Sequence, residues 1–125
     1  MKNLTGIDHP AIAAENLESL AQWYSDVVGY SKHYFDEQKR VWILRGPDGT
    51  FIEMMQKDDH DRQQRTVLTP GLSHLAFRVD DLSVAIKALE AAGVRWIGEI
   101  VGAIGGGKLR SFEDPEGNML QVVQR

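Results

Sequence analysis

Four side chains that can ligate a metal ion stand at matching positions in two similar parts of the sequence. His9 ends a GIDH stretch and His74 ends a GLSH stretch, and Glu53 and Gln121 match each other further along. Imidazole nitrogens together with carboxylate and amide oxygens form a ligand set suited to a divalent transition metal ion. The sequence therefore predicts a metal site made of His9, Glu53, His74 and Gln121.

The surroundings of Glu53 support this prediction. The run Phe51 to Met55, FIEMM, places one carboxylate among four large apolar side chains. An unpaired carboxylate in such surroundings costs several kcal/mol or is held protonated, so it needs a partner, and a cation is one. A single histidine near a strand end, or a single glutamate in a strand, has an ordinary structural explanation. It is the recurrence in both halves that favours a metal site.

An internal duplication organises the chain. The stretch PDGTFIEMMQ, Pro47 to Gln56, aligns with PEGNMLQVVQ, Pro115 to Gln124, just as the two histidine stretches align with each other. We expect two repeats, at about 5–57 and 71–125, joined by the polar connector 58–70. Each repeat has the order strand, helix, strand, strand, strand.

The expected helices and strands follow from the spacing of apolar residues and from the residues that begin and end each element. Asn16 begins a helix with apolar residues at helical spacing up to Val28, ended by Gly29, and Asp80-Asp81 begins a second helix from Leu82 to Leu89, ended by Gly93. A glycine-rich stretch, 102–107, predicts a hairpin-like connection in the second repeat. The expected strands are a short run ending at Ala14, Tyr30 to Phe35, Arg40 to Leu44, Phe51 to Met55, Leu75 to Val79, Val94 to Ile100, Lys108 to Phe112, and Met119 to Val123.

Alternation along these strands separates two faces. Ile52 and Met54 share one face, and Glu53 lies on the other face together with Phe51 and Met55. In the second repeat, Leu75 and Phe77 form an apolar face suited to packing under a helix, which leaves His74 on the opposite side. If each helix covers one face of its sheet, all four candidate ligands lie on the other face.

Further candidates surround this face. Arg78 and Arg110 are either contacts for an anionic substrate group or ordinary exposed strand charges. His33 and His60 lack a counterpart in the other repeat and are expected to be surface residues. Apolar side chains that could line a substrate pocket are Trp42, Phe51, Met55 and Met119.

Composition limits the possible functions. A chain of 125 residues with 42% hydrophobic residues is long enough for one compact domain. A net charge of -4 and the lack of a basic stripe argue against nucleic acid as a partner. The absence of cysteine removes disulfides and thiolate ligands, and a cytoplasmic location is expected. No stretch approaches the roughly 20 apolar residues that cross a bilayer, so no membrane association is expected.

Three stretches together resemble the vicinal oxygen chelate superfamily, which includes glyoxalase I, epimerases, extradiol dioxygenases and bleomycin-binding proteins. They are HPAIAAENLESLAQWYSDVVGY, HLAFRVDDLSVAIKALEAAGV and FEDPEGNMLQVVQ. The resemblance implies an α+β fold in which two paired βαβββ modules form a curled mixed sheet around a cleft, as a single glyoxalase-like domain over 1–125. It also implies a homodimer and metal ligands at His9, Glu53, His74 and Gln121.

Gln121 departs from the commonest pattern of that superfamily, in which a glutamate stands at this position. A glutamine oxygen can ligate a metal but cannot accept a proton, so within this set only Glu53 can serve as the catalytic base. With one carboxylate rather than two, the site is expected to hold its metal less tightly.

The resulting functional prediction is a metal-dependent lyase or isomerase of glyoxalase or epimerase type. It would act through an enediolate on a small substrate with vicinal oxygens, using Zn, Ni, Co, Mn or Fe. Two alternatives remain open: a metal-free binding protein of bleomycin-resistance type for an antibiotic or metabolite, and a one-domain extradiol dioxygenase. Metal content distinguishes the first alternative, and oxygen uptake with a catechol the second.

Overall fold

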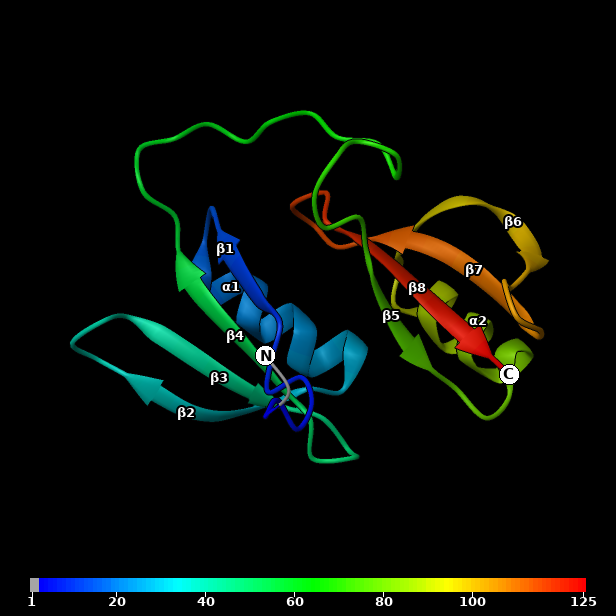
Figure 1. Ribbon diagram of the computed structural model, residues 1–125, viewed down its shortest axis with the longest axis horizontal. Coiled ribbons are helices and arrows are strands. Elements are labelled where there is room, and N and C mark those ends of the chain that lie inside the picture. Colours follow the sequence, from blue (N-terminus) through cyan, green and yellow to red (C-terminus); the bar gives the residue numbers. More distant parts are fainter. Residues whose placement is uncertain (1–2) are drawn as a thin grey trace. The chain divides into compact units, whose positions relative to one another are not determined.

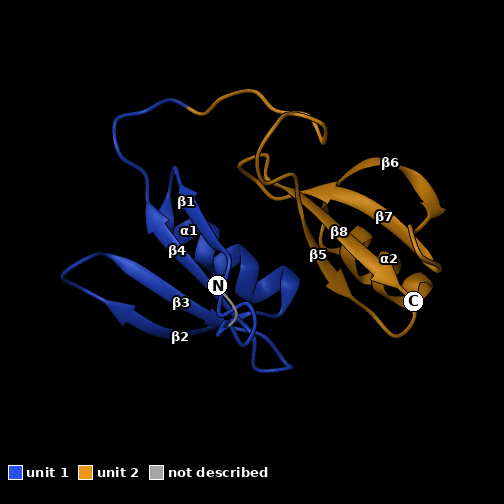
Figure 2. Cartoon of the chain, viewed as in Figure 1, with its two compact units in different colours: residues 1–61 blue, residues 62–125 orange. Residues whose placement is uncertain are grey.

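The computed structural model describes residues 3–125, which divide into two compact units. Unit 1 is Met1–Asp61 and unit 2 is Arg62–Arg125, coloured separately in Figure 2. The division falls inside the connector expected at 58–70. That the two repeats form a single domain stays a prediction, and each unit is described by itself.

Unit 1 contains one four-stranded sheet and one helix (Figure 1). Its elements in chain order are β1 (Ala11–Ala14), α1 (Leu17–Trp23), the π-helical turn η1 (Tyr24–Val28), β2 (Ser31–Asp36), β3 (Val41–Arg45) and β4 (Phe51–Gln56). The strand order is β1-β4-β3-β2, with β1 parallel to β4 and the other neighbours antiparallel.

Unit 2 repeats this plan with the strand order β5-β8-β7-β6, in which β5 is parallel to β8. Its elements are β5 (Leu75–Arg78), α2 (Leu82–Ala91), β6 (Arg95–Gly102), β7 (Lys108–Glu113) and β8 (Met119–Gln124). The predicted α+β fold of two βαβββ modules is therefore confirmed.

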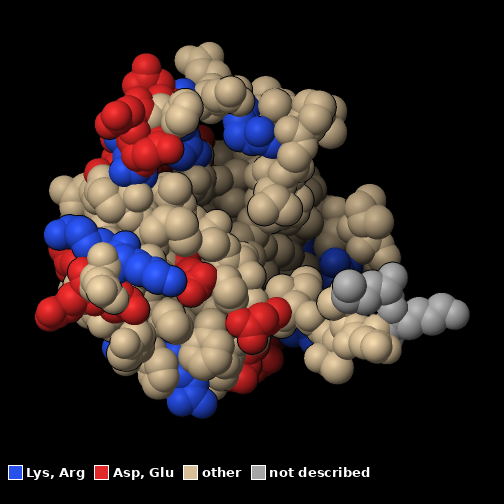
Figure 3. Space-filling model, turned by 60° about the vertical axis from the view of Figure 1, so that its left-hand side comes forward, with Lys and Arg blue, Asp and Glu red and all other residues tan. Residues whose placement is uncertain are grey.

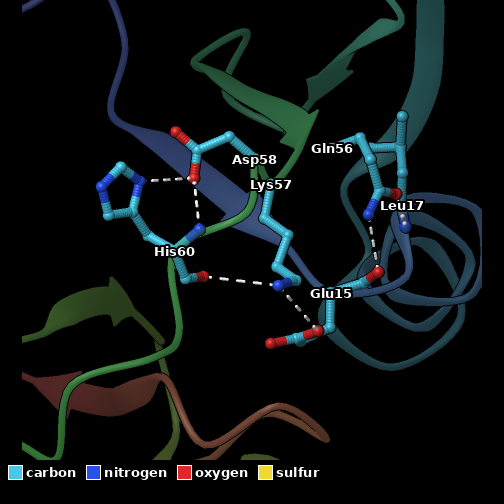
Figure 4. Close-up of polar contacts among 6 residues, drawn as sticks. All are labelled: Glu15, Leu17, Gln56, Lys57, Asp58 and His60. Carbon is cyan, nitrogen blue, oxygen red and sulfur yellow. Dashed lines mark hydrogen bonds and ion pairs between the residues drawn. The ribbon is translucent and has the colours of Figure 1, made fainter.

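Both helices begin in the same way. The side chains of Asn16 and Asp81 accept hydrogen bonds from the backbone N–H groups of Ser19 and Val84, each at 3.1 Å. A glutamine at the end of the last strand adds a second acceptor in each unit: Gln56 accepts from the N–H of Leu17, as Figure 4 shows, and Gln124 accepts from that of Leu82. These bonds satisfy N–H groups that a helix start leaves without partners.

The first helix ends differently from the prediction. A continuous α-helix was expected up to Val28, but α1 ends at Trp23 and the chain continues as the wider turn η1. The N–H groups of Gly29 and Tyr30 both bond to the carbonyl of Tyr24. Gly29 has φ 83°, a left-handed conformation that glycine adopts without strain, and it stops the turn there.

One face of each sheet packs against the helix of its unit and forms the core. The contacts run from α1 to β4 and from α2 to β8. The buried apolar residues on these faces are Ala14, Leu17, Leu20, Ala21, Tyr24, Leu44, Ile52 and Met54 in unit 1, and Leu82, Ile86, Leu89, Phe112, Leu120 and Val122 in unit 2. Val123 is also buried, but it lies on the other face of β8, the face of Gln121. The opposite face, which bears Glu53 in unit 1 and Gln121 in unit 2, is called the helix-free face below.

The strand β6 is longer than predicted. It starts at Arg95 and reaches Gly102, with a shift in pairing to β7 between Ile97 and Val101. Beyond Gly102 the chain turns in a hairpin, closed by hydrogen bonds from Ala103 to Gly107 and from Gly106 to Ala103. The glycine-rich stretch therefore connects two antiparallel strands and does not begin a helix.

The surface carries charges of both signs. On the face that Figure 3 shows, acidic and basic side chains are interspersed and form no continuous basic band. Within residues 3–125, none of the helices combines the length and the apolar character needed to span a bilayer.

Candidate metal and substrate site

His9 and Glu53 meet on the helix-free face of unit 1. Ala11 of β1 lies opposite Glu53 of β4 in the parallel pairing, and the N–H of Glu53 donates to the carbonyl of Pro10 at 3.0 Å. His9 precedes Ala11 by two positions, so the two side chains reach the same face. The Nε2 of His9 lies 2.5 Å from Oε2 of Glu53, and both side chains are about one third exposed, at 34% and 30%.

Asp8 holds the other nitrogen of His9. Its Oδ2 lies 2.7 Å from Nδ1, and an ionised carboxylate only accepts hydrogen bonds, so Nδ1 carries a proton. The hydrogen bond to Asp8 and the nearby charge of Glu53 raise the pKa of His9 above its ordinary value of 6.5. His9 is therefore protonated more readily than a free histidine.

Unit 2 places the second pair in the same register. Ala76 of β5 lies opposite Gln121 of β8, and His74 precedes Ala76 by two positions. The Nδ1 of His74 lies 2.9 Å from the hydroxyl of Ser73, so its Nε2 is the nitrogen left for another contact. The amide nitrogen of Gln121 donates to the hydroxyl of Ser111 at 3.2 Å, which leaves the carbonyl oxygen as the ligating atom.

These donor atoms fit a divalent metal in chemistry. Two ligands of one ion with bonds of about 2.1 Å lie about 3 Å apart, so His9 and Glu53 need to separate only slightly from their present contact. Within the described part of the chain, residues 3–125, no three His, Cys, Asp or Glu side chains gather as a metal-holding group. Each unit by itself supplies two candidate ligands, one histidine and one oxygen donor.

Four of the predicted substrate-binding residues lie on the helix-free faces. Phe51 and Met55 flank Glu53 along β4, and Met119 occupies the equivalent position beside Gln121 on β8; all three are half-buried. Arg78 of β5 pairs with Val123, which follows Gln121 by two positions on β8, so Arg78 lies on the same face as Gln121. Its side chain is exposed. No hydrogen bond or ion pair holds its guanidinium within residues 3–125.

Trp42 lies on the helix side of its sheet. It pairs with Met54, its Nε1 donates to Glu18 of α1 at 3.0 Å, and Lys32 lies 5.1 Å from its ring centroid. It is therefore on the opposite side of the sheet from Glu53.

Arg110 is likewise on the helix side of β7, where it pairs with Val122. Its guanidinium stacks on Trp96 at 4.2 Å and donates to the carbonyl of Gly98 at 3.1 Å. It also lies within 4 Å of the carboxylates of Glu90 and Glu99. The donors of this arginine are thus used within unit 2.

Sequence reasoning missed the residues that support the ligands, namely Asp8, Ser73 and Ser111. The signal available was that a polar residue directly precedes each histidine. Ser111 could not be found without knowing that β7 pairs with β8 at Gln121. His33, expected on the surface, is exposed, and its ring centroid lies 5.8 Å from that of Phe51.

His60 is a surface residue with a partner of its own. Asp58 accepts from the backbone N–H of His60 and lies 2.9 Å from its Nδ1, and Lys57 reaches both the carbonyl of His60 and the carboxylate of Glu15 (Figure 4). The side chain of His60 is 92% exposed. Through Lys57, these contacts link the start of the connector to Glu15, which lies just before α1.

A cavity of about 470 Å³ in unit 2 lies away from these residues. Residues around it include Ser83, Ile100, Lys108 and Arg125, and none of the predicted site residues. The first N–H groups of α2 nearby already bond to Gln124 and Asp81. The candidate site is therefore assigned from the ligand chemistry on the helix-free faces and not from this cavity.

The fold and the paired positions of the candidate ligands define a duplicated βαβββ protein in which each module carries one histidine and one oxygen-bearing side chain at equivalent places. A sequence profile of the Glyoxalase/Bleomycin resistance protein/Dioxygenase superfamily matches residues 8–112. The chain belongs to this superfamily, and the resemblance inferred from its sequence is confirmed.

Two curated relatives are similar to this chain. Protein MelA of Shewanella colwelliana is 29% identical over 108 residues, which are 75% of this chain and 31% of that protein. Glyoxylase I 4 of Arabidopsis thaliana is 22% identical over 125 residues, covering 96% of this chain and 71% of that protein. The chain thus spans about a third of the length of MelA.

Solved structures share the fold. An integron cassette protein from the Halifax Harbour sewage outfall metagenome has a TM-score of 0.79 and 23% identity, covering 98% of this chain and 100% of its own. The fosfomycin resistance protein FosX of Listeria monocytogenes has a TM-score of 0.75 and 15% identity, with coverage of 98% and 94%. TnmS3, an antibiotic binding protein from Streptomyces sp. CB03234, has a TM-score of 0.74 and 18% identity, with coverage of 99% and 98%.

Proposed function

We propose that this protein is a metal-dependent lyase or isomerase of glyoxalase or epimerase type that acts on a small substrate with two vicinal oxygens. The observation that carries the proposal is the contact of His9 with Glu53 on the helix-free face of unit 1. In unit 2 the strand register gives His74 and Gln121 equivalent positions. Members of the superfamily commonly use divalent metal ions and bind small molecules, which supports the proposal.

In this proposal the four ligands have different roles. A bound divalent metal would draw electron density from the two substrate oxygens and so lower the cost of removing a proton from the neighbouring carbon. Glu53 accepts that proton while the C–H electron pair moves toward a substrate oxygen, and it then returns the proton to the adjacent carbon. His9, His74 and Gln121 hold the site. Glu53 has to turn one oxygen away from His9 to act as the base.

Substrate contacts come from four other residues of the helix-free faces. Phe51, Met55 and Met119 provide half-buried apolar surface, and Arg78 provides an exposed guanidinium for an anionic group. Trp42 and Arg110, both engaged on the helix side, influence the site only through the strands that carry them.

The first experiment is elemental analysis of protein purified without chelators, followed by a thermal-shift screen. We expect about one Zn, Ni, Co, Mn or Fe ion per site and a higher thermal midpoint when metal is added. The screen uses small α-oxo thiohemiacetals, acyl-CoA thioesters and catechols. Protein that carries no metal and gains no stability from any added ion would refute the proposal.

The second experiment tests the base. Glu53→Gln is expected to slow exchange of the substrate's carbon-bound proton with solvent by at least about a hundredfold, since a glutamine cannot accept a proton. Glu113→Gln is a matched control, because Glu113 lies on the helix-free face of unit 2 and is 29% exposed. Unchanged exchange in Glu53→Gln would remove Glu53 from the mechanism.

A second candidate function is metal-free binding of an antibiotic or metabolite. The neutral Gln121 and the half-buried Phe51, Met55 and Met119 favour it, and TnmS3, which shares the fold, is named as an antibiotic binding protein. In that case Met55→Ala and Met119→Ala weaken ligand binding, while chelators leave it unchanged. Oxygen uptake with a catechol would instead indicate the dioxygenase alternative.

We also propose a homodimer, because members of the superfamily are often dimeric. Light scattering coupled to size-exclusion chromatography should give a mass near twice the 14.0 kDa of the chain. A mass near that of one chain at high protein concentration would contradict this part of the proposal.

A further inference from the structure

Three of the four candidate ligands are held by a hydrogen bond on the atom that would not face a metal. Asp8 holds Nδ1 of His9, Ser73 contacts Nδ1 of His74, and Ser111 accepts from the amide nitrogen of Gln121. In unit 2 these contacts leave Nε2 of His74 and Oε1 of Gln121 available, whereas in unit 1 the opposite atom, Nε2 of His9, faces the carboxylate of Glu53. The two histidine partners are the residues directly before them in the chain.

The two histidine contacts differ in chemistry. The carboxylate of Asp8 only accepts, so it requires a proton on Nδ1 of His9. The hydroxyl of Ser73 can either accept from Nδ1–H or donate to an unprotonated Nδ1, so it fits both tautomers of His74. A metal binds the unprotonated nitrogen of a neutral imidazole, which means that only Asp8 enforces Nε2 as the binding atom.

We propose that Asp8 is a positioning residue, which keeps the Nδ1 proton on His9 and so presents the Nε2 lone pair, beside Glu53, to a divalent cation. This inference rests on the proposed metal site. A carboxylate behind a ligating histidine fixes the ring and raises the basicity of the ligand.

The exposure of Asp8 limits how much its charge contributes. Its side chain is 89% exposed, so solvent and salt screen the charge, whereas the direction of the hydrogen bond is unaffected by screening. We therefore expect Asp8 to act mainly by orienting the imidazole.

The first test is the metal dissociation constant of the full chain, measured with Zn²⁺ and Co²⁺. Loss of a partner behind a ligating histidine typically costs 10–100-fold in affinity, and for the exposed Asp8 we expect about tenfold weaker binding in Asp8→Ala. Asp8→Asn keeps an oxygen that accepts from Nδ1–H, so its affinity should stay within about threefold of the parent protein.

Asp58→Ala is the matched control. Asp58 makes the same contact with Nδ1 of a histidine, at 2.9 Å to His60, in the cluster of Figure 4, which contains neither His9 nor Glu53. The variant removes one carboxylate from unit 1 and should leave the metal dissociation constant unchanged.

The second test needs no metal. In Glu53→Ala, which frees Nε2 from its carboxylate partner, imidazole ¹H–¹⁵N correlations at a pH above the pKa of His9 should show the Nδ1–H tautomer. In Asp8→Ala/Glu53→Ala the Nε2–H tautomer, which a neutral imidazole favours in water, should predominate. The ordinary spectrum of the remaining residues in both variants would show that each still folds.

The outcomes separate this inference from the proposed function. If the parent protein binds no metal, the proposed site and the inference both fail. If it binds metal, but Asp8→Ala binds equally well or the tautomer does not change, only the inference is overturned. An Asp8→Asn variant as weak as Asp8→Ala would also overturn it, because charge and not orientation would then account for the loss.

Discussion

The Nε2 of His9 lies 2.5 Å from Oε2 of Glu53 on the helix-free face of unit 1. This contact joins a residue just before β1 to the middle of β4, and it depends on the parallel pairing that sets Ala11 opposite Glu53. A proton on Nε2 and a metal ion compete for the same lone pair. The pair therefore links metal binding to pH.

Metal binding should weaken as the pH falls through the raised pKa of His9. The hydrogen bond that Nδ1–H of His9 donates to Asp8 and the charge of Glu53 raise this pKa, so protons compete with the metal at a higher pH than for an ordinary histidine. Metal titrations at a series of pH values should show this decline. In Asp8→Ala the midpoint of the decline should move to lower pH, and an unchanged midpoint would contradict this explanation.

The stability of chelator-treated protein should vary with pH in the opposite sense. A histidine whose pKa is raised in the folded state binds its proton more tightly there, so His9 stabilises the fold fully below its ordinary pKa of 6.5. That contribution is lost as the pH rises through the raised pKa. Urea midpoints across this window should decline in the parent protein and decline less in His9→Gln. Equal slopes in the two proteins would argue against the contribution.

The sequence was sufficient for the repeated fold and for the faces of the ligand strands. Because side chains alternate along a strand, burial of Ile52 and Met54 under α1 requires Glu53 to lie on the other face, and the internal repeat carries the same argument to Gln121. The pairing of His9 with Glu53 required one further fact, the parallel register of β1 and β4.

The face on which Trp42 lies could not be predicted from the sequence, because it depends on the pairing register of β3 with β4. Trp42 and Phe51 were grouped as pocket walls, but Trp42 pairs with Met54 and so faces α1. Nothing in a single strand indicates which of its two faces matches a given face of its neighbour. The ending of α1 as a π-helical turn could not be predicted either. The spacing of apolar residues does not distinguish hydrogen bonds between residues five apart from those between residues four apart.

Gln121→Glu should tighten metal binding. The predicted ligand set has a single carboxylate, at Glu53, and a second one would neutralise more of the cation's charge. Ser111, which accepts from the amide nitrogen of Gln121, can instead donate its hydroxyl proton to the new carboxylate. Isothermal titration with Zn²⁺ measures the effect.

Gln124→Glu is a control for charge on the same strand, since Gln124 bonds to Leu82 on the helix side. A gain of similar size in both variants would show a general charge effect and not ligation.

Gly107→Ala should destabilise the hairpin that joins β6 and β7. Gly107 has φ 99°, and an added Cβ would collide with the carbonyl oxygen of Gln124 and come within 2.9 Å of Cα of Arg125. Both atoms are backbone and cannot move aside without breaking the β7–β8 pairing, so we expect a loss of more than about 2 kcal/mol in the free energy of unfolding.

Gly102→Ala is the matched control at the other end of the hairpin, because nothing lies within 4 Å of its added Cβ. Urea unfolding should find Gly102→Ala within about 1 kcal/mol of the parent protein. Equal losses in the two variants would mean that the chain can relax around Gly107, and that the close approach of this hairpin to β8 does not constrain the fold.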